Sequence, residues 1–221
     1  MRLGLRQAVA LRRLVLTGPA AGRGRGRRAG GAPTRGRGMA AAAGAAGGLL
    51  LVDASPGAAG VEGFKFGPWD IAPTEVFART ERSFAFVNLK PVVPGHVLVS
   101  PVRVVPRFAE LEGAEVADMW LLAQRVGREL EAHHAATSLT LTVQDGPQAG
   151  QTVPHVHIHV LPRRAGDFQN NDEIYDAIDA ASEGQAAAAA GKPLDLDEER
   201  KPRTREEMAA EAAELRELFA V

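Results

Sequence analysis

Residues 155–161 have the sequence His-Val-His-Ile-His-Val-Leu, with histidines at alternate positions. The residues between them, Val156 and Ile158, are β-branched, which favours a β-strand. Successive side chains of a strand point to opposite faces, so His155, His157 and His159 are expected on one face and the aliphatic side chains on the other. Half of the six histidines of the chain would then share one short surface. The pattern predicts a functional site backed by the hydrophobic core.

Three interpretations of this histidine face are open from the residue types alone. Imidazole is a common metal ligand, but on a straight strand His159 would start about 13 Å from His155, so a single ion would need a bend to reach all three. A structural cluster is a second interpretation, although partly cationic rings on one face repel each other. The third is nucleophilic catalysis at phosphorus, because a neutral imidazole nitrogen can carry a phosphoryl group as a phosphoramidate.

A glycine-rich loop at residues 145–152 precedes the histidines and favours the third interpretation. Gly146, Gly150 and the backbone around Gln151 and Thr152 can direct N–H groups at phosphate oxygens. A histidine with an ordinary pKa near 6.5 is roughly three quarters neutral at pH 7, and a neighbouring imidazolium lowers that pKa further. One face can therefore supply both a neutral nucleophile and a proton donor.

The residues around the loop predict an α+β fold. Strands are expected at 83–89, 96–100 and 138–144, with the histidine strand following. Apolar residues at helical spacing predict one amphipathic helix over residues 114–134. Its predicted stripe is Val116, Met119, Trp120, Ala123, Val126 and Leu130. Two strands, a helix and two strands joined by short turns predict an antiparallel sheet with one long helix packed on it.

Composition divides the chain into four parts. Residues 1–60 are rich in Arg, Gly and Ala and are expected to be a disordered extension, with an organellar targeting segment as the alternative. Residues 61–165 are expected to form the catalytic domain, and residues 166–203 a flexible acidic and Ala-rich segment. Residues 204–221 are expected to be a C-terminal helix, with Thr204 and Glu207 forming a capping box. Its apolar stripe must pack on this domain or on a second subunit.

Charge and composition exclude several classes of protein. Residues 1–60 contain ten Arg and one acid, so the other 161 residues hold 16 basic and 26 acidic side chains, a net charge of -10. This acidic body argues against a nucleic-acid-binding protein. No apolar run approaches the ~18 residues of a membrane span, and the absence of cysteine excludes disulfides and thiol catalysis. A cytoplasmic location is the default expectation.

A longer pattern resembles a known family. Residues 144–163, QDGPQAGQTVPHVHIHVLPR, resemble the signature of the histidine triad superfamily, and more narrowly its fragile histidine triad branch, the diadenosine triphosphate hydrolases. Residues 87–99, VNLKPVVPGHVLV, resemble the same branch. So do residues 166–168, 171–175 and 206–209. The similarity runs from about Phe64 to Tyr175 and resumes in the last helix; in detail it is strongest to members from green plants and algae.

The resemblance implies a reaction and roles for four residues. His157 matches the nucleophile that attacks the α-phosphorus of a dinucleoside polyphosphate. ADP would leave, an adenylyl-histidine would form, and water would release AMP. His155 and His159 match the flanking histidines, which position the nucleophile and contact the phosphate chain, with His159 assisting the bridging oxygen. Gln144 matches a residue that binds the phosphates and supports the leaving group.

The resemblance also implies binding residues, cofactors and partners. Asn88 matches a ribose contact, and His96 matches a position that supports the triad. The residues that match the phosphate-binding loop are Gly150, Gln151, Thr152 and Val153. Mg²⁺ or Mn²⁺ is expected on the substrate's phosphates and no metal in a protein site, and a homodimer is expected. Adenylyl sulfate and AMP phosphoramidate are expected as further substrates. Trp69 departs from the family, because animal relatives carry a histidine there.

Three alternative functions stay open. A galactose-1-phosphate uridylyltransferase of the same superfamily would carry Gln at the third triad position, so His159 counts against it. A nucleoside phosphoramidase is closer, but it lacks the loop pattern of residues 144–153. A signalling module, whose substrate complex is the active species, would need the same binding site as the hydrolase.

Overall fold

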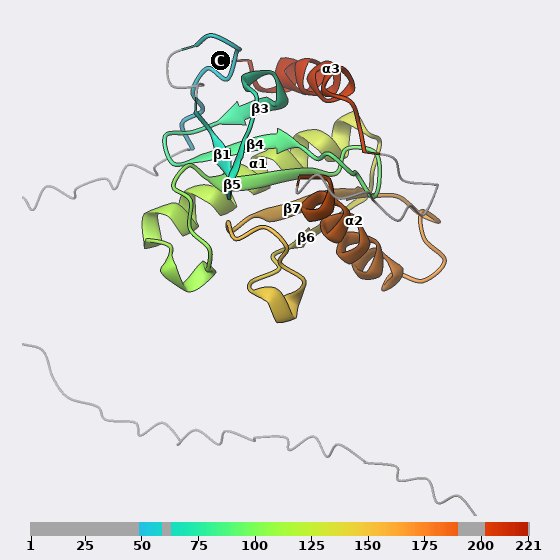
Figure 1. The fold of residues 1–221 in the computed structure, drawn as a ribbon. Helices are drawn as coiled ribbons and strands as arrows, with labels where there is room; N and C mark the ends of the chain where they lie inside the picture. Colours follow the sequence, from blue (N-terminus) through green and yellow to red (C-terminus); the bar gives the residue numbers. More distant parts are fainter. Residues whose placement is uncertain (1–48, 59–62, 190–201, 221) are drawn as a thin grey trace, which may run out of the picture. The chain divides into compact units, whose positions relative to one another are not determined.

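The computed structural model describes residues 49–58, 63–189 and 202–220, with the backbone alone for 183–189. All of these residues belong to one compact unit, Ala46–Val221. Its centre is a five-stranded antiparallel sheet in the order β3-β4-β5-β7-β6 (Figure 1). The strands of this sheet are β3 Val76–Arg79, β4 Ser83–Val87, β5 Val97–Pro101, β6 Ser138–Thr142 and β7 Ile158–Arg163.

The remaining elements cover the two faces of the sheet. A small hairpin, β1 Lys65–Phe66 and β2 Trp69–Asp70, precedes the sheet in the chain. The helices are α1 Gly113–His133, α2 Glu173–Ala189 and α3 Arg205–Arg216. Short 3-10 turns are η1 Pro73–Glu75, η2 Phe108–Glu110, η3 Pro147–Ala149 and η4 Glu217–Phe219. Figure 1 shows α1 behind the sheet and α2 in front of it. The predicted α+β architecture, with one long helix on an antiparallel sheet, is confirmed.

The main hydrophobic core lies between the sheet and α1, and it explains why the histidine pattern alternates. Val156, Ile158 and Val160 are buried in this core with Met119 and Val126 of α1. The alternate residues of the same segment therefore face the other side of the sheet. On that side Leu98 pairs with His159 across β5 and β7. Phe66 and Phe86 pack there in a second apolar cluster with Leu98.

The histidine strand is shorter than the sequence predicts. Strand pairing with β5 begins only at Ile158, so His155 and His157 precede β7. The backbone of Val156 instead bonds outside the ladder, because its N–H donates to the Val105 carbonyl and its carbonyl accepts from the Ser100 hydroxyl. The expected alternation of faces is confirmed, but the segment holding two of the histidines is anchored by loop and side-chain contacts.

Helix α1 confirms the predicted helix over residues 114–134 to within one residue, while its buried stripe differs at two positions, Val116, which is half-buried, and Trp120. Met119, Ala123, Val126 and Leu130 are buried as predicted. Trp120, which the sequence pattern included, is 37% exposed, and Leu122 is fully buried in its place. The reason is geometric: positions 119, 122, 126 and 130 follow the helical repeat more closely than 120 does.

The segment expected to be flexible, residues 166–203, contains helix α2 in its first half. Ile174 and Ile178 are buried and pack with Leu161 of β7 and with Val93. The acidic, Ala-rich composition did not indicate a packed helix. Two isoleucines one turn apart are nevertheless enough to attach this helix to the sheet. Residues 190–201 lie outside the described part.

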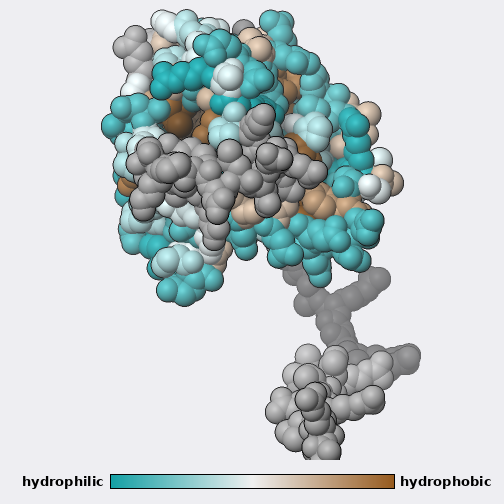
Figure 2. Space-filling model, turned by 45° about the vertical axis from the view of Figure 1, so that its right-hand side comes forward, coloured by the Kyte–Doolittle hydropathy of each residue, from teal (hydrophilic) through white to brown (hydrophobic). Residues whose placement is uncertain are grey.

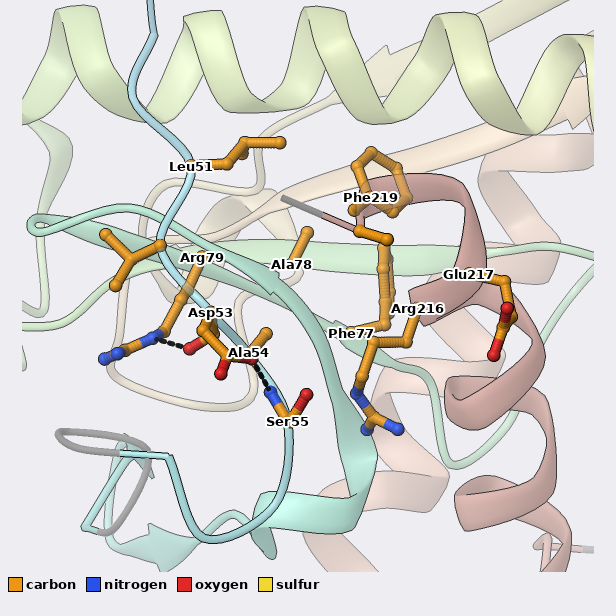
Figure 3. Close-up of a pocket in the computed structure, with 12 residues that line it drawn as sticks. Leu51, Asp53, Ala54, Ser55, Phe77, Ala78, Arg79, Arg216, Glu217 and Phe219 are labelled. Atoms are coloured by element: carbon orange, nitrogen blue, oxygen red, sulfur yellow. Dashed lines mark hydrogen bonds between the residues drawn. The ribbon is translucent and has the colours of Figure 1, made fainter.

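The N-terminal boundary is also earlier than the expected residue 61. Val52 forms a bridge with Arg79 of β3, and Ala54 is buried. The Arg79 side chain donates to the Asp53 carbonyl at 2.7 Å, and the Asp53 carboxylate accepts from the Ser55 N–H at 2.8 Å (Figure 3). A cavity of about 340 Å³ lies between this segment, β3 and the end of α3. The expected disorder or targeting role of residues 1–48 lies outside the described residues.

The C-terminal helix confirms its predicted start and its predicted packing face. The Thr204 hydroxyl accepts from the Glu207 N–H, and the Glu207 carboxylate accepts from the Thr204 N–H. The apolar stripe packs against the same domain, where it joins the core beside Phe77. The buried residues of the stripe are Met208, Ala212, Leu215 and Phe219.

The surface agrees with the polar composition of the chain. Hydrophilic residues, in teal, predominate among the coloured atoms of the face in Figure 2, and brown apolar residues occupy smaller areas. Among the described helices, none combines the length and the apolar character needed to cross a membrane.

The packing of α3 can be tested by shortening its most buried side chain. Leu215→Ala should lower the free energy of unfolding by about 2–5 kcal/mol, because Leu215 is fully buried and its removal leaves a cavity. Glu214→Ala, one position away on the exposed face, should change it by less than about 1 kcal/mol. Urea unfolding of the two variants gives the comparison, and equal effects would contradict the docking of α3.

Candidate active site

The tautomer of His157 is determined by one backbone hydrogen bond. Its Nδ1 lies 2.7 Å from the His155 carbonyl oxygen. A carbonyl oxygen only accepts hydrogen bonds, so Nδ1 carries the proton and Nε2 keeps its lone pair. The edge of the Phe66 ring meets the His157 ring, with centroids 4.9 Å apart. The residue is buried, yet its basic nitrogen is left unprotonated, as a nucleophile requires.

Both ring nitrogens of His155 are engaged by the backbone. Nδ1 accepts from the Gly67 N–H at 3.1 Å, and Nε2 lies 3.0 Å from the Pro101 carbonyl and 3.2 Å from the Arg103 carbonyl. His155 therefore ties the β1–β2 turn to the end of β5 and holds its own carbonyl in place for His157. These contacts support the position of His157, but they leave no nitrogen of His155 for the phosphate contact that the resemblance implied.

A hydrogen-bond chain determines the tautomer of His159. The Val92 N–H donates to Nδ1 of His96 at 3.1 Å, so Nε2 of His96 carries the ring proton. That nitrogen lies 2.9 Å from Nδ1 of His159 and donates to it. The ring proton of His159 must then reside on Nε2, which is buried and has no partner. His96 thus has the supporting role expected of it, and His159 presents an unused N–H donor.

Burial keeps these rings neutral. Loss of hydration lowers the pKa of His157 to about 4, although the hydrogen bond to the His155 carbonyl acts in the opposite direction. Burial, with a smaller contribution from the His157 charge, lowers the pKa of His96 to about 3. The pKa of His159 lies well below its usual range, again mainly because of burial. Adjacent neutral rings, 4.8 Å apart between the centroids of His157 and His159, therefore offer an acceptor and a donor.

The glycine-rich loop lies beside Gln144, as predicted. Gly150 has a left-handed φ of 82°, and a Cβ there would lie 2.5 Å from the Gln144 amide nitrogen, so only glycine fits. The Gln151 side chain braces the loop internally, because it accepts from the Gly146 N–H and donates to the Pro106 carbonyl. In this structure the Gln151 side chain therefore has a structural role. The N–H groups of Gly150 and Gln151 are also used within the loop, where they donate to the carbonyls of Pro147 and Gly146, so the donors expected at Gly146, Gly150 and Gln151 are already bonded.

Three further residues have an expected binding role: Asn88, which follows β4, and Thr152 and Val153, at the end of the glycine-rich loop. The Asn88 amide oxygen accepts from the Lys90 N–H at 3.0 Å, and its amide nitrogen lies against the His96 ring, where the acceptor is Nδ1 at 3.5 Å because Nε2 carries the proton. Asn88 is thus brought into the histidine network. The Thr152 hydroxyl donates to the Ser182 carbonyl of α2, and Val153 is buried in the second apolar cluster.

A cavity of about 470 Å³ opens next to the nucleophile. Phe66, which touches the His157 ring, forms part of its wall, and Trp69 lies in the same wall. The apolar part of the lining is Phe66, Trp69, Ile71, Phe86, Val87, Leu89, Leu98, Val153 and Met208, and the charged part is Asp70, Glu75, Arg203 and Arg205. A flat aromatic ring would be well accommodated by such a lining.

Sequence analysis missed three contributors to this site. Phe66 belongs to a two-residue strand too short to show a periodic signal. Asp179 and Ser182 of α2 bond to the Gln144 side chain, and they lie in a segment whose composition suggested flexibility. No local pattern marks these residues, because tertiary packing alone brings them to the histidines.

The structure also bears on the metal and structural interpretations. Within the described ranges, no group of three or more His, Asp or Glu side chains is placed to hold a metal ion. A purely structural cluster would satisfy every ring nitrogen, as His155 does, whereas Nε2 of His159 is left without a partner. The arrangement fits the catalytic interpretation best.

Comparison with known proteins places the fold and site in one family. Residues 71–166 match the model of the HIT domain. The chain is 56% identical over 156 residues to the bifunctional bis(5'-adenosyl)-triphosphatase/adenylylsulfatase FHIT of Arabidopsis thaliana, covering 71% of this chain and 84% of the relative. The chain belongs to the histidine triad family and, within it, to the fragile histidine triad proteins.

Two further similarities agree with this assignment. The bis(5'-adenosyl)-triphosphatase of Dictyostelium discoideum is 49% identical over 154 residues, covering 70% of this chain and 91% of the relative. The crystal structure of the Caenorhabditis elegans NitFhit protein superposes with a TM-score of 0.55 at 46% identity. That match covers 71% of this chain and 30% of the larger protein.

The buried neutral histidines predict a pH dependence of stability. In the unfolded chain His96 and His157 titrate near 6.5, whereas their folded pKa values are about 3 and about 4. As the pH falls below 6.5 only the unfolded state takes up these protons. The free energy of unfolding should therefore decrease by about 1.4 kcal/mol per pH unit for each histidine until the folded pKa is reached.

Urea unfolding between about pH 5 and pH 7 measures this slope. His157→Asn should reduce it by the contribution of one histidine. His133→Asn, at the exposed end of α1, is the matched control and should leave the slope close to that of the natural chain. An unchanged slope in His157→Asn would contradict the burial of a neutral ring.

Proposed function

We propose that the protein hydrolyses dinucleoside triphosphates, with diadenosine triphosphate cleaved to AMP and ADP. The observation that carries the proposal is the pairing of two adjacent buried rings, one with a free lone pair on Nε2 of His157 and one with a free N–H on Nε2 of His159. Both relatives of highest identity named above are bis(5'-adenosyl)-triphosphatases. The apolar cavity beside His157 fits an adenine ring.

The first step transfers the adenylyl group to the enzyme. Nε2 of His157 attacks the α-phosphorus, and the bond from that phosphorus to the bridging oxygen breaks. Negative charge develops on the departing ADP oxygen, where the Nε2–H of His159 can donate. Gln144 binds the phosphate oxygens beside the glycine-rich loop, where Gly150 allows the backbone to approach the Gln144 amide. The Nδ1–H bond to the His155 carbonyl strengthens as His157 becomes cationic in the phosphoramidate.

The second step releases the nucleotide. Water attacks the phosphorus, the N–P bond breaks, and AMP leaves with the water oxygen. Nε2 of His157 recovers its lone pair, because the ring proton stays on Nδ1, hydrogen-bonded to the His155 carbonyl, throughout. The sum is one substrate and one water converted to AMP and ADP, with up to two protons released to solvent as the two new terminal phosphates ionise.

A divalent cation is expected to arrive with the substrate. The triphosphate chain carries charge that Mg²⁺ or Mn²⁺ neutralises, and these ions bind phosphate oxygens readily. The acidic body of the domain gives a further reason for a metal-complexed substrate, since it repels a bare polyphosphate.

Side activities and rival roles follow from the same intermediate. Adenylyl sulfate would form the same adenylyl-histidine, and the name of the Arabidopsis relative includes adenylylsulfatase. AMP phosphoramidate remains a prediction of the sequence, as does a cytoplasmic or organellar location. A signalling role of the substrate complex is the alternative, and a His157→Asn variant that retains the cellular role would favour it.

Product analysis tests the proposed reaction. Incubation with diadenosine triphosphate and Mg²⁺ should give equal AMP and ADP. His157→Ala should lower kcat by about 10⁴-fold or more, because the nucleophile is lost. His133→Asn should retain full activity. A decrease of only tenfold in His157→Ala would refute the role of His157, and no turnover of the dinucleotide, with AMP phosphoramidate consumed instead, would indicate a phosphoramidase.

A homodimer is proposed on the basis of the open sheet edge. Strand β6 pairs only with β7 in the sheet, and Leu141 on β6 is 39% exposed. The other edge differs, because β3 carries the Val52 bridge and is packed by α3. The stripe of α3 is buried within its own domain, so β6 and the exposed face of α1 with Trp120 are better candidates for the interface.

Light scattering after gel filtration tests the dimer. The natural chain should have twice its mass of 23.3 kDa, and Leu141→Lys should shift it toward the monomer, because an edge lysine opposes strand pairing. Val104→Lys is the matched control at a 41% exposed apolar residue that belongs to neither β6 nor α1. A monomeric natural chain would refute the proposal.

A further inference from the structure

Both ends of the Gln144 side chain are bonded to helix α2. Its amide nitrogen donates to Oδ1 of Asp179, and its amide oxygen accepts from the Ser182 hydroxyl at 3.3 Å. Gln144 itself is buried, whereas Asp179 is an exposed residue. One of the two N–H groups of the Gln144 amide, which could bind a substrate phosphate, therefore already has an anionic acceptor.

The same carboxylate lies against the glycine-rich loop. A Cβ on Gly150 would be 2.8 Å from Oδ1 of Asp179, so the carboxylate oxygen contacts the loop where its backbone comes nearest to Gln144. The Thr152 hydroxyl donates to the Ser182 carbonyl at 3.0 Å, which joins the loop to the same turn of α2. Loop, Gln144 and helix form one connected network.

Helix α2 is anchored independently of this network. Ile174 and Ile178 are buried against Leu161 and Val93, one to two turns before Ser182. The described side chains of α2 include Glu173, Asp176 and Asp179 and no Lys or Arg. An acidic helix is thus held beside the loop by apolar contacts, while its last described turn makes polar contacts that an anion can replace.

We propose that Asp179 is an internal competitor of the substrate phosphates. Its carboxylate occupies the Gln144 amide and the Gly150 face in the free enzyme, and a phosphate oxygen displaces it when the dinucleotide binds. The inference rests on the proposed function, since it assigns Gln144, beside the loop, to phosphate. The contact between Asp179 and Gln144 weakens the binding of polyphosphates. It also determines how much negative charge a ligand needs in order to displace the carboxylate. It makes Asp179 and Ser182 determinants of substrate affinity, with no part in bond making.

Steady-state kinetics of Asp179→Ala with diadenosine triphosphate and Mg²⁺ tests the proposal. KM should fall by about threefold to tenfold with kcat changed less than twofold, because a competing hydrogen bond and a like charge are removed. Ser182→Ala should act in the same direction, since it removes the second contact to Gln144. Asp176→Ala is the matched control, an exposed acid on the same helix without a contact to Gln144, and should leave KM unchanged.

Calorimetric binding of ADP separates this inference from the proposed function. ADP should bind Asp179→Ala about threefold to tenfold more tightly than the natural chain, whether or not the dinucleotide is hydrolysed. If the natural chain does not hydrolyse the dinucleotide but Asp179→Ala still binds ADP more tightly, the proposed hydrolase is refuted and the role of Asp179 as a competitor is supported. An ADP affinity that is unchanged in Asp179→Ala would overturn the proposed competition. A lower kcat in Asp179→Ala would also overturn it, because it would show that Asp179 positions Gln144 for catalysis.

Discussion

The hydrogen bond from Nδ1 of His157 to the carbonyl of His155 is the contact on which the rest of the site depends. It places the ring proton away from the substrate side and leaves the lone pair of Nε2 for chemistry. The carbonyl is held because both ring nitrogens of His155 bond to backbone groups from the β1–β2 turn and from the end of β5. Two histidines spaced by one residue thus differ in their surroundings: His157 keeps a lone pair on Nε2, whereas both ring nitrogens of His155 are bonded to the backbone.

Burial is the second factor that keeps the histidine rings neutral. A neutral imidazole costs far less to bury than a cation, so the apolar surroundings lower the pKa of each ring and keep the nucleophile ready over the physiological range. The same burial leaves Nε2 of His159 without a protein partner among the described residues. An unsatisfied buried donor costs stability, and here it lies where a bridging phosphate oxygen would supply the missing acceptor. The unpaired N–H of His159 therefore lowers the stability of the folded protein and leaves a donor available to a ligand.

Much of the fold could be predicted from local patterns. The α1 stripe, the capping box of α3 and the alternation of Val156 and Ile158 with the histidines each arise from a periodicity that neighbouring residues display. The early start of the domain at Leu49 and the helix at Glu173 were not predicted, because few apolar residues attach them and their composition is that of solvent-exposed chain. The start of β7 at Ile158 was also missed, since a loop carbonyl at Val105 takes the place of a ladder partner.

The sequence by itself determined the family, through its resemblance to known members, and the face on which the histidines lie, through residue type and spacing; that His157 is the nucleophile stays a prediction of the resemblance. Tertiary structure alone decided which nitrogen of each ring carries a proton, since that depends on carbonyls and N–H groups distant in the chain, such as Gly67 and Pro101. It also decided that Asp179 would meet Gln144, 35 residues away, through a helix attached by two isoleucines. Sequence periodicity predicts the helix or strand to which a residue belongs and the face on which it lies. Proton positions and competing contacts depend on groups from other elements, which the local pattern does not contain.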